Sequence, residues 1–261
     1  MSEAYARVER ARADGAGVRA LEREAANAPP APGFYDALRR PMVGVIAEVK
    51  RRSPSKGSIN GALSAAIQAR AYETGGAAAV SILTEPVHFG GSVDDLREAR
   101  AAVGLPLLRK DFHVDELQLV EARAAGAAAV LLIARALAPD RLRRLAAFAR
   151  SIALEPLVEV RDRAELDRAL DAEARVIGVN NRDLETLVID PTVGDALLAR
   201  VPGSCAAVWE SGVRAAADVE RAALAGADAV LVGSSVSGAD DPAAAVRALT
   251  HVRRGTRDDR N

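Results

Sequence analysis

Gly126-Ala-Ala-Ala-Val-Leu-Leu-Ile133 is the stretch that decides the fold, because close copies of it recur along the chain. Gly76-Ala-Ala-Ala-Val80 precedes Ser-Ile-Leu-Thr, and Gly226-Ala-Asp-Ala-Val230 precedes Leu-Val-Gly. The copies lie roughly 50 and 100 residues apart. Both spacings are multiples of about 25 residues, which indicates a repeating unit of that length. Each copy follows an Ala/Arg/Glu-rich helical stretch, and its glycine stands where a helix C-cap is expected before a strand. The pattern predicts repeated βα units with parallel strands.

Eight apolar runs of strand length follow this scheme, at residues 43–50, 78–83, 106–110, 128–133, 155–160, 175–180, 206–210 and 228–232. Eight βα units in roughly 250 residues is the size of a (β/α)8 barrel. A doubly wound sheet is the alternative, but it usually carries a Gly-rich fingerprint after its first strand, and here Lys50 is followed by Arg-Arg-Ser-Pro-Ser. We therefore expect an α/β fold, a (β/α)8 TIM barrel with an additional N-terminal helical segment.

The rest of the chain frames that barrel. Residues 1–40 are expected to form an N-terminal helical extension that packs on it, made of one extra helix, an Asn-Ala-Pro-Pro-Ala-Pro-Gly linker and a short helical turn. Residues 41–250 form the catalytic barrel, and residues 251–261 form a polar, frayed tail. The single cysteine, Cys205, excludes an internal disulfide and suits a reducing cytoplasm. No apolar run reaches about 18 residues, so we expect a cytoplasmic protein that does not contact a membrane.

Charge and histidine content exclude two further classes of partner. The net charge is −1 and the basic residues are scattered, without the basic stripe and interleaved aromatics of a nucleic-acid surface. His88, His113 and His251 are far apart, so no Cys/His metal spacing occurs. We expect neither metal nor cofactor, and a monomer whose partner is a phosphorylated small molecule.

Lysine is nearly absent from the chain. Of 35 basic residues only Lys50, Lys56 and Lys110 are lysine, in a sequence rich in Ala and Arg. Arg can replace Lys wherever a solvated charge suffices, but Arg cannot give up a proton, whereas a buried Lys can. Lys50 and Lys110 close two of the apolar strands, which favours a functional role over chance retention. Lys56 lies in a Ser/Pro/Gly loop, where the two explanations are equally good.

Charged residues gather at the ends of the first, third, fifth and seventh strands, namely Lys50, Lys110, Glu159 and Glu210. Alternate strands of a barrel contribute inward side chains to the same layer. Glu48 lies two residues before Lys50 and also points inward. Interleaved signs would neutralise one another in this layer. A salt-bridge plug is the structural alternative, but Arg would suit such a plug better in this composition.

The last two βα loops predict an anion site. Glu210-Ser-Gly212 follows the seventh strand and Gly233-Ser-Ser235 follows the eighth, where barrels often bind phosphate through backbone N–H groups. A plain helix cap is the alternative. Phe89 and Phe112 lie in loops at the same rim, either as a platform for a flat ligand or as loop packing. Trp209 alternates with Glu210 and is expected to face the helix layer.

With these residues in place, the chain resembles the indole-3-glycerol phosphate synthase family from about Phe34 to Ala248. The resemblance is most specific in Glu48-Val-Lys-Arg-Arg-Ser-Pro-Ser-Lys-Gly57, Leu108-Arg-Lys-Asp-Phe112, Leu157-Val-Glu-Val160, Gly178-Val-Asn-Asn-Arg-Asp-Leu184 and Glu210-Ser-Gly212. Several ordered motifs at the family's spacing go well beyond a shared barrel fold. The family closes the indole ring of 1-(2-carboxyphenylamino)-1-deoxyribulose 5-phosphate and releases carbon dioxide and water.

The resemblance implies a role for each candidate residue. Lys110 resembles the general acid, Glu159 the base and Lys50 the lysine that holds substrate anions. The polar residues that orient the sugar hydroxyls and tune the lysines would be Glu48, Asn180 and Glu210. Substrate would be contacted by Ser53 and Arg182, its phosphate by Ser211, Gly212, Gly233 and Ser234, and its anthranilate ring by Phe89 and Phe112.

The chain departs from the family at Val236-Ser-Gly238, where Leu-Met-Arg is usual, at Trp209, which replaces a smaller residue, and in its first 30 residues.

Three alternatives remain beside ring closure. One is a non-catalytic phosphosugar-binding barrel, and another is a paralogue serving a different indole product. The third is a related barrel, either phosphoribosylanthranilate isomerase or an aldolase. The isomerase needs a Cys/Asp pair, and Cys205 precedes a strand rather than ending one.

Overall fold

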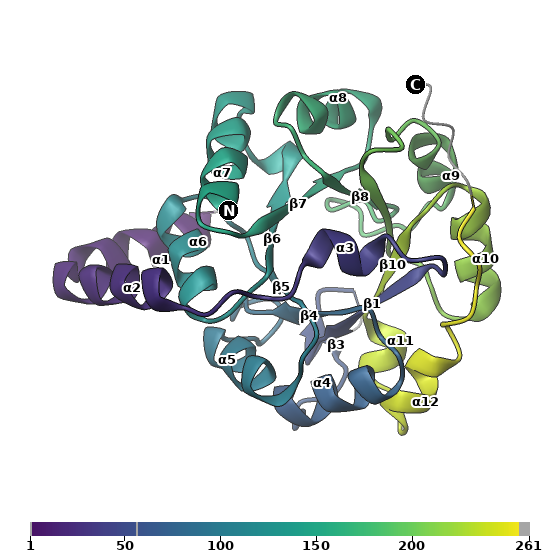
Figure 1. Ribbon diagram of the computed structural model, residues 1–261, viewed down its shortest axis with the longest axis horizontal. Helices are drawn as coiled ribbons and strands as arrows, with labels where there is room; N and C mark the ends of the chain where they lie inside the picture. Colours follow the sequence, from purple (N-terminus) through teal and green to yellow (C-terminus); the bar gives the residue numbers. More distant parts are fainter. Residues whose placement is uncertain (1, 56, 256–261) are drawn as a thin grey trace.

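The computed structural model describes residues 2–55 and 57–255, and its centre is a closed barrel of eight parallel strands (Figure 1). The strand order around the barrel is β1-β10-β9-β8-β7-β6-β5-β4. Their bounds are β1 (Gly44–Val49), β4 (Ala79–Leu83), β5 (Leu107–Lys110), β6 (Ala129–Ile133), β7 (Glu155–Val160), β8 (Val176–Asn180), β9 (Ala206–Glu210) and β10 (Ala229–Val232). Each lies within one residue of the expected range, so the predicted TIM barrel is confirmed.

Helices cover the outside of the barrel between successive strands. They are α4 (Ala65–Thr74), α5 (Val93–Ala102), α6 (Glu116–Ala124), η1 (Ala134–Ala136), α7 (Pro139–Ser151), α8 (Arg163–Asp171), α9 (Thr192–Leu198), α10 (Ala216–Leu224), α11 (Ser234–Ser237) and α12 (Pro242–Arg247). The repeated glycines end helices as expected: Gly76, Gly126 and Gly226 have φ of 90°, 84° and 97°. Only glycine adopts this left-handed conformation without strain, so the repeat turns the chain from each helix into the next strand.

Two apolar cores hold the layers together. The outer core lies between strands and helices and contains Trp209, which is 3% exposed, as the alternation with Glu210 predicted. The inner core fills the barrel with side chains such as Ile46 and Leu157. Its lower end is closed by α3 (Phe34–Leu38), which lies across the barrel in Figure 1 and buries Phe34 and Leu38. Polar chemistry is therefore confined to the opposite end, where the strands terminate.

The N-terminal segment forms two helices before the linker, not one. These are α1 (Ser2–Ala13) and α2 (Gly15–Asn27), and both lie beside α6 in Figure 1. The break falls at Asp14, whose side chain accepts a hydrogen bond from the backbone N–H of Gly17 and caps α2. Arg123 of α6 donates to the carbonyls of Ala28 and Pro29, at 2.6 and 2.9 Å, and so fixes the linker.

Two peripheral segments complete the chain. A hairpin of β2 (Arg52–Ser53) and β3 (Gly57–Ser58) follows β1, while Lys56 lies outside the described residues. Residues 251–255, the described part of the expected frayed tail, are instead held against the barrel. Arg254 donates a hydrogen bond to the buried carboxylate of Asp228 at 2.6 Å. Residues 256–261 lie outside the described residues.

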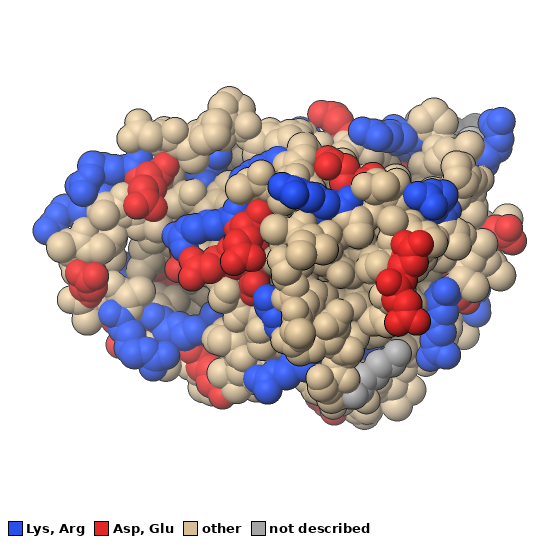
Figure 2. All heavy atoms as spheres, turned by 90° about the horizontal axis from the view of Figure 1, so that it is seen from below, with Lys and Arg blue, Asp and Glu red and all other residues tan. Residues whose placement is uncertain are grey.

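On the face drawn in Figure 2, basic and acidic side chains of the described residues alternate in small groups, and no continuous basic stripe crosses it. Within residues 2–55 and 57–255, no helix is both long enough and apolar enough to cross a membrane.

Candidate active site

Charged side chains of the first, third, fifth and seventh barrel strands meet at the carboxyl ends of the strands, here called the mouth. The Nζ atom of Lys110 lies 3.0 Å from Oε2 of Glu210 and 3.5 Å from Oε2 of Glu48. The other oxygen of Glu48 lies 2.8 Å from Nζ of Lys50. Glu48 and Glu210 are buried, whereas the two amines keep some exposure to the cavity above. The expected layer of interleaved signs therefore forms.

The electrostatics of this layer keep its charges in place. Burial by itself would raise the pKa of Glu48, but the nearby charges of Lys50 and Lys110 outweigh burial and lower it. Burial would likewise lower the pKa of Lys110, yet the carboxylates of Glu210, Glu48 and Glu159 raise it above the usual lysine value. Lys110 is thus not a lysine that burial has primed to lose its proton. It is held protonated, as a resting proton donor must be.

Glu159 behaves in the opposite way. It ends the inward face of β7 and is 5% exposed. Burial, followed by the like charge of Glu210, raises its pKa to about 8, although Lys110 and a hydrogen bond from Asn180 oppose the shift. Glu159 and Glu210 share this buried space, where two neighbouring carboxyl groups cannot both ionise without a cost. The layer therefore contains one carboxyl whose pKa lies close to neutral pH.

Two glycines of the intervening strands make room for these side chains. A Cβ atom at Gly178 of β8 would lie 2.1 Å from Oε1 of Glu210. A Cβ atom at Gly233, directly after β10, would lie 2.5 Å from Oε1 of Glu48 and 2.7 Å from Nζ of Lys50. The long charged side chains of one set of strands occupy the space left by the missing side chains of the other set.

One side of the mouth is polar and suits a phosphate. A cavity of about 210 Å³ is lined by Ser211, Gly212, Gly233 and Ser234, and by Arg182. Ser211 and Gly212 have φ of 67° and 91°, so the turn after β9 is left-handed at both residues. The indole N–H of Trp209 donates to the carbonyl of Ser211 at 3.1 Å and supports this strained turn.

Asn180 links the phosphate side to the charged layer. Its Oδ1 atom accepts hydrogen bonds from Oγ of Ser211 and from the backbone N–H of Arg182, both at 2.9 Å. Its amide nitrogen remains to donate to Glu159. One side chain therefore holds the turn after β9, the loop after β8 and the carboxyl of β7 in fixed relation.

The other side of the mouth is apolar. Phe89 and Phe112 line an adjoining cavity of about 130 Å³, together with Leu131, Ile133 and Leu184. The two cavities share five lining residues, namely Glu48, Lys50, Lys110, Arg182 and Ser211. The sequence analysis gave Leu184, in the loop after β8, no role, and it missed Leu131 and Ile133 because apolar side chains at strand ends look like ordinary core. Their only signal is the inward alternation of β6, which carries Leu131 and Ile133 to the same rim.

Two expected site residues do not line either cavity. Glu210 lies beneath the surface of the mouth and meets the site only through Lys110 and Glu159. Ser53 is buried in the hairpin of β2 and β3. The remaining expected residues lie along the two cavities.

The N-terminal helix α1 is tied to the residue that follows Lys110. Arg7 donates to both carboxylate oxygens of Asp111, at 3.0 and 2.6 Å. Asp111 also accepts from Thr84 at 2.8 Å and from the backbone N–H of Phe112 at 2.8 Å. Burial would raise the pKa of Asp111, but the hydrogen bond from Arg7 and the charge of Arg109 lower it well below its usual value. Sequence patterns gave no sign of this contact, because its partners are 104 residues apart.

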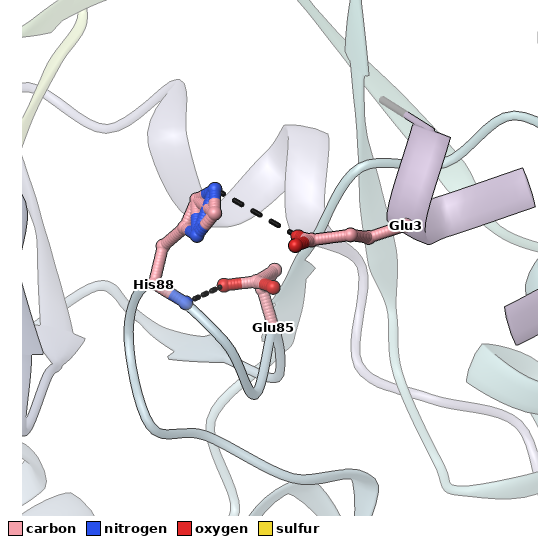
Figure 3. Close-up of side chains that lie close together, drawn as sticks. All are labelled: Glu3, Glu85 and His88. Atoms are coloured by element: carbon pink, nitrogen blue, oxygen red, sulfur yellow. Dashed lines mark hydrogen bonds and ion pairs between the residues drawn. The ribbon is translucent and has the colours of Figure 1, made fainter. Parts of the chain in front are cut away.

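A second contact of α1 lies beside Phe89 (Figure 3). Glu3, Glu85 and His88 place their ligand atoms within 4.8 Å of one another, a grouping that could hold a metal ion and that the sequence analysis did not foresee. The oxygens of Glu85 already accept hydrogen bonds from the backbone N–H groups of Val87, His88 and Phe89. Nε2 of His88 lies 3.8 Å from Glu3, and both side chains are about half exposed. We interpret the group as a contact between α1 and the loop that carries Phe89.

Comparison with known sequences gives a consistent result. A family model described as Indole-3-glycerol phosphate synthase matches residues 2–249. Indole-3-glycerol phosphate synthase 2 of Streptomyces coelicolor is 54% identical over 225 residues, which cover 86% of this chain and 87% of that protein. Indole-3-glycerol phosphate synthase of Mycolicibacterium smegmatis is 48% identical over 229 residues, 88% of this chain and 84% of that protein.

Solved structures with little sequence similarity share the fold. A thiamine phosphate pyrophosphorylase from Pyrococcus furiosus superposes with a TM-score of 0.61 at 17% identity, covering 81% of this chain and 95% of that chain. A 3-hexulose-6-phosphate synthase from Salmonella typhimurium gives 0.62 at 16% identity, covering 79% and 96%. At these identities the likeness concerns the barrel alone.

Proposed function

Because the chain belongs to the indole-3-glycerol phosphate synthase family, we propose that the charged layer and the two cavities of its mouth carry out that family's reaction. The reaction closes the ring of 1-(2-carboxyphenylamino)-1-deoxyribulose 5-phosphate with loss of carbon dioxide and water, a step of tryptophan biosynthesis. The observation that carries the assignment of residues is the position of Lys110, between two carboxylates and at the junction of an apolar and a polar cavity.

The two cavities support one orientation of the substrate. Its phosphate suits the backbone N–H groups around Gly212 and Gly233 and the charges of Arg182 and Lys50. Its aromatic ring suits the apolar cavity of Phe89 and Phe112. The ketone would then lie between them, beside Lys110, which lines both cavities.

Lys110 acts as the general acid in the first step. The aromatic carbon that bears the carboxylate attacks the ketone carbon, and the carbonyl oxygen takes a proton from Nζ as the new bond forms. The raised pKa of Lys110 guarantees that this proton is present at neutral pH. Carbon dioxide then leaves, and the apolar surroundings favour the loss of a carboxylate charge.

Glu159 acts as the base in the dehydration. The hydroxyl must gain a proton to depart as water, and the new ring must lose one; a carboxyl with a pKa of about 8 can give the first proton and then, as a carboxylate, take the second. Asn180 orients Glu159 through its hydrogen bond, and the charge of Glu210 raises the pKa of that carboxyl. Glu48 holds both amines, while Ser53 supports the loop after β1.

This proposal extends to the setting of the enzyme. We propose a cytoplasmic monomer that needs neither metal nor nucleotide, because acid and base are both supplied by side chains of the mouth. A phosphosugar-binding barrel without activity is the main alternative. The raised pKa of Glu159 counts against it, since binding alone gains nothing from a carboxyl that is costly to ionise.

Turnover is the experiment that tests this function. The full chain, given the carboxyphenylamino-deoxyribulose phosphate without added metal or nucleotide, is expected to produce indole fluorescence and one equivalent of carbon dioxide. A Schiff-base aldolase would instead be trapped covalently by borohydride. Absence of indole product at high enzyme concentration would reject the proposed function.

Lys110→Arg is the matched variant for the same assay. Arginine keeps the positive charge facing Glu210 and Glu48 but cannot release a proton. We expect turnover to fall by at least about 10²-fold, the usual contribution of a positioned acid, while affinity for inorganic phosphate stays within about threefold. A nearly normal rate in Lys110→Arg would remove the general-acid role from Lys110.

A further inference from the structure

The end of β1, where Lys50 is placed, is held by an unusual contact with α11. The parallel ladder between β1 and β10 ends at the pair Ala47 and Val232, so strand pairing with β10 stops before Lys50. The hydroxyl of Ser237 takes over there. Its Oγ atom accepts a hydrogen bond from the backbone N–H of Lys50 at 3.0 Å and donates to the backbone carbonyl of Lys50 at 2.8 Å.

Ser237 is itself fixed by buried neighbours. It is 0% exposed, and its hydroxyl lies near that of Tyr72 of α4, which is equally buried. Tyr72 donates to the carbonyl of Glu48 at 3.0 Å. Gln68 donates to the Tyr72 hydroxyl at 3.0 Å and to the carbonyl of Val236 at 3.3 Å. Three polar side chains therefore hold the backbone of the two charged residues at the end of β1, Glu48 and Lys50. They are Ser237, Tyr72 and Gln68.

The side chain of Lys50 is confined on its other sides as well. Glu48 holds Nζ at 2.8 Å, and Gly233 leaves just enough space for it, since a Cβ there would lie 2.7 Å from Nζ. A shift of the Lys50 backbone would therefore move Nζ away from the polar cavity or against Gly233.

We propose that Ser237 is a positioning residue that orients the Lys50 side chain toward the anionic groups of the substrate. The inference rests on the proposed function and adds a residue to it. A single hydroxyl satisfies both backbone groups of Lys50, which alanine, valine or methionine at this position could not do. Ser237 stands in the Val236-Ser-Gly238 segment, one of the places where the sequence departs from the pattern of the family it resembles.

Ser237→Cys is the test, because a thiol keeps the volume of the buried side chain but is a weak hydrogen-bond donor and acceptor. We expect the KM for the substrate to rise roughly fivefold, with kcat within about twofold, since Lys50 binds substrate while Lys110 performs the acid step. Ser81→Cys is the matched control: Ser81 is also 0% exposed, and within the described chain its hydroxyl has no hydrogen-bond partner. We expect its KM to stay at the wild-type value.

A double variant distinguishes a positioning role of Ser237 from a general contribution to the stability of the fold. If Ser237 acts through Lys50, Ser237→Cys changes KM in the wild type but not in the Lys50→Met variant, because that variant has no amine to orient. The inference is overturned if KM is unchanged in Ser237→Cys, or if KM rises equally in the Lys50→Met background. Turnover by the wild-type chain in the same assay distinguishes either result from failure of the proposed function.

Discussion

Glu159 shows how a single residue acquires a function from its surroundings. A lone carboxyl at the end of a strand would ionise near pH 4.5, but here burial and the neighbouring Glu210 move the pKa to about 8. The nearest lysine does not cancel this effect, because Lys110 is already paired with Glu210 at 3.0 Å. In the proposed mechanism, two carboxyl groups that differ in their partners therefore divide the work: Glu210 holds the acid and Glu159 serves as the base.

This shift has a consequence for stability. Below about pH 4.5 Glu159 is protonated in both the folded and unfolded chains and costs nothing. Between about pH 5 and 8 the unfolded chain ionises while the folded chain keeps its proton, so the free energy of unfolding falls as pH rises. We expect Glu159→Gln to gain stability over the wild type across this window in urea denaturation. Stability curves that stay parallel from pH 5 to 8 would contradict the raised pKa.

At the same scale, sequence reasoning identified the charged residues but not their electrostatic state. The scarcity of lysine marked Lys50 and Lys110, and alternation placed both inside the barrel. Alternation does not reveal which partner each amine faces. The sequence therefore could not show that Lys110 has three carboxylate neighbours from other strands, which raise its pKa.

Some barrel strands contribute charged side chains to the site, and others contribute the space that these side chains occupy. β8 places Gly178 beside the Glu210 side chain of β9, and a Cβ at this position would lie 2.1 Å from a carboxylate oxygen. The motif Gly178-Val-Asn-Asn-Arg-Asp-Leu184 was recognised in the sequence, but the reason for its glycine was not. That reason depends on the register of β8 against β9, in which Asn180 pairs with Glu210.

Gly178→Ala tests this use of a strand. The added methyl group would meet Oε1 of Glu210 at 2.1 Å and Leu157 at 2.9 Å, so Glu210 must move away from Lys110. We expect kcat to fall by at least about tenfold, because the acid and the base both lose a partner. Gly104→Ala is the control, since its Cβ would meet only Glu73 at 3.5 Å. Equal kcat values for the two variants would show that Glu210 needs no such space.

The N-terminal helices mark the limit of element-level prediction. Composition indicated a helical segment and a Pro-rich linker, and both are present. Nothing local showed that α1 would reach Asp111 with Arg7, next to Lys110 and Phe112. Long-range ion pairs leave no periodic trace in a sequence, so contacts of this kind emerge only from the folded chain.

At the scale of the whole molecule, the barrel separates stability from chemistry. Its lower end is closed by Phe34 and Leu38 of α3, while the charges collect at the mouth. The fold could be predicted almost completely because Gly-Ala repeats and eight strands are local patterns. The site could be predicted in outline because barrel strands alternate their layers. Of its apolar cavity, the sequence predicted Phe89 and Phe112 but not Leu131 and Ile133, which resemble core residues.

The central claim is that one ligand spans both cavities with its reacting centre at Lys110. A crystal structure of the full chain with a reduced, unreactive analogue of the carboxyphenylamino-deoxyribulose phosphate measures this most directly. We predict the phosphate beside Gly212 and Gly233, the aromatic ring beside Phe89 and Phe112, and the oxygen on the former ketone carbon within hydrogen-bond distance of Nζ of Lys110. An analogue bound in the reverse direction, or with that oxygen away from Lys110, would contradict the account.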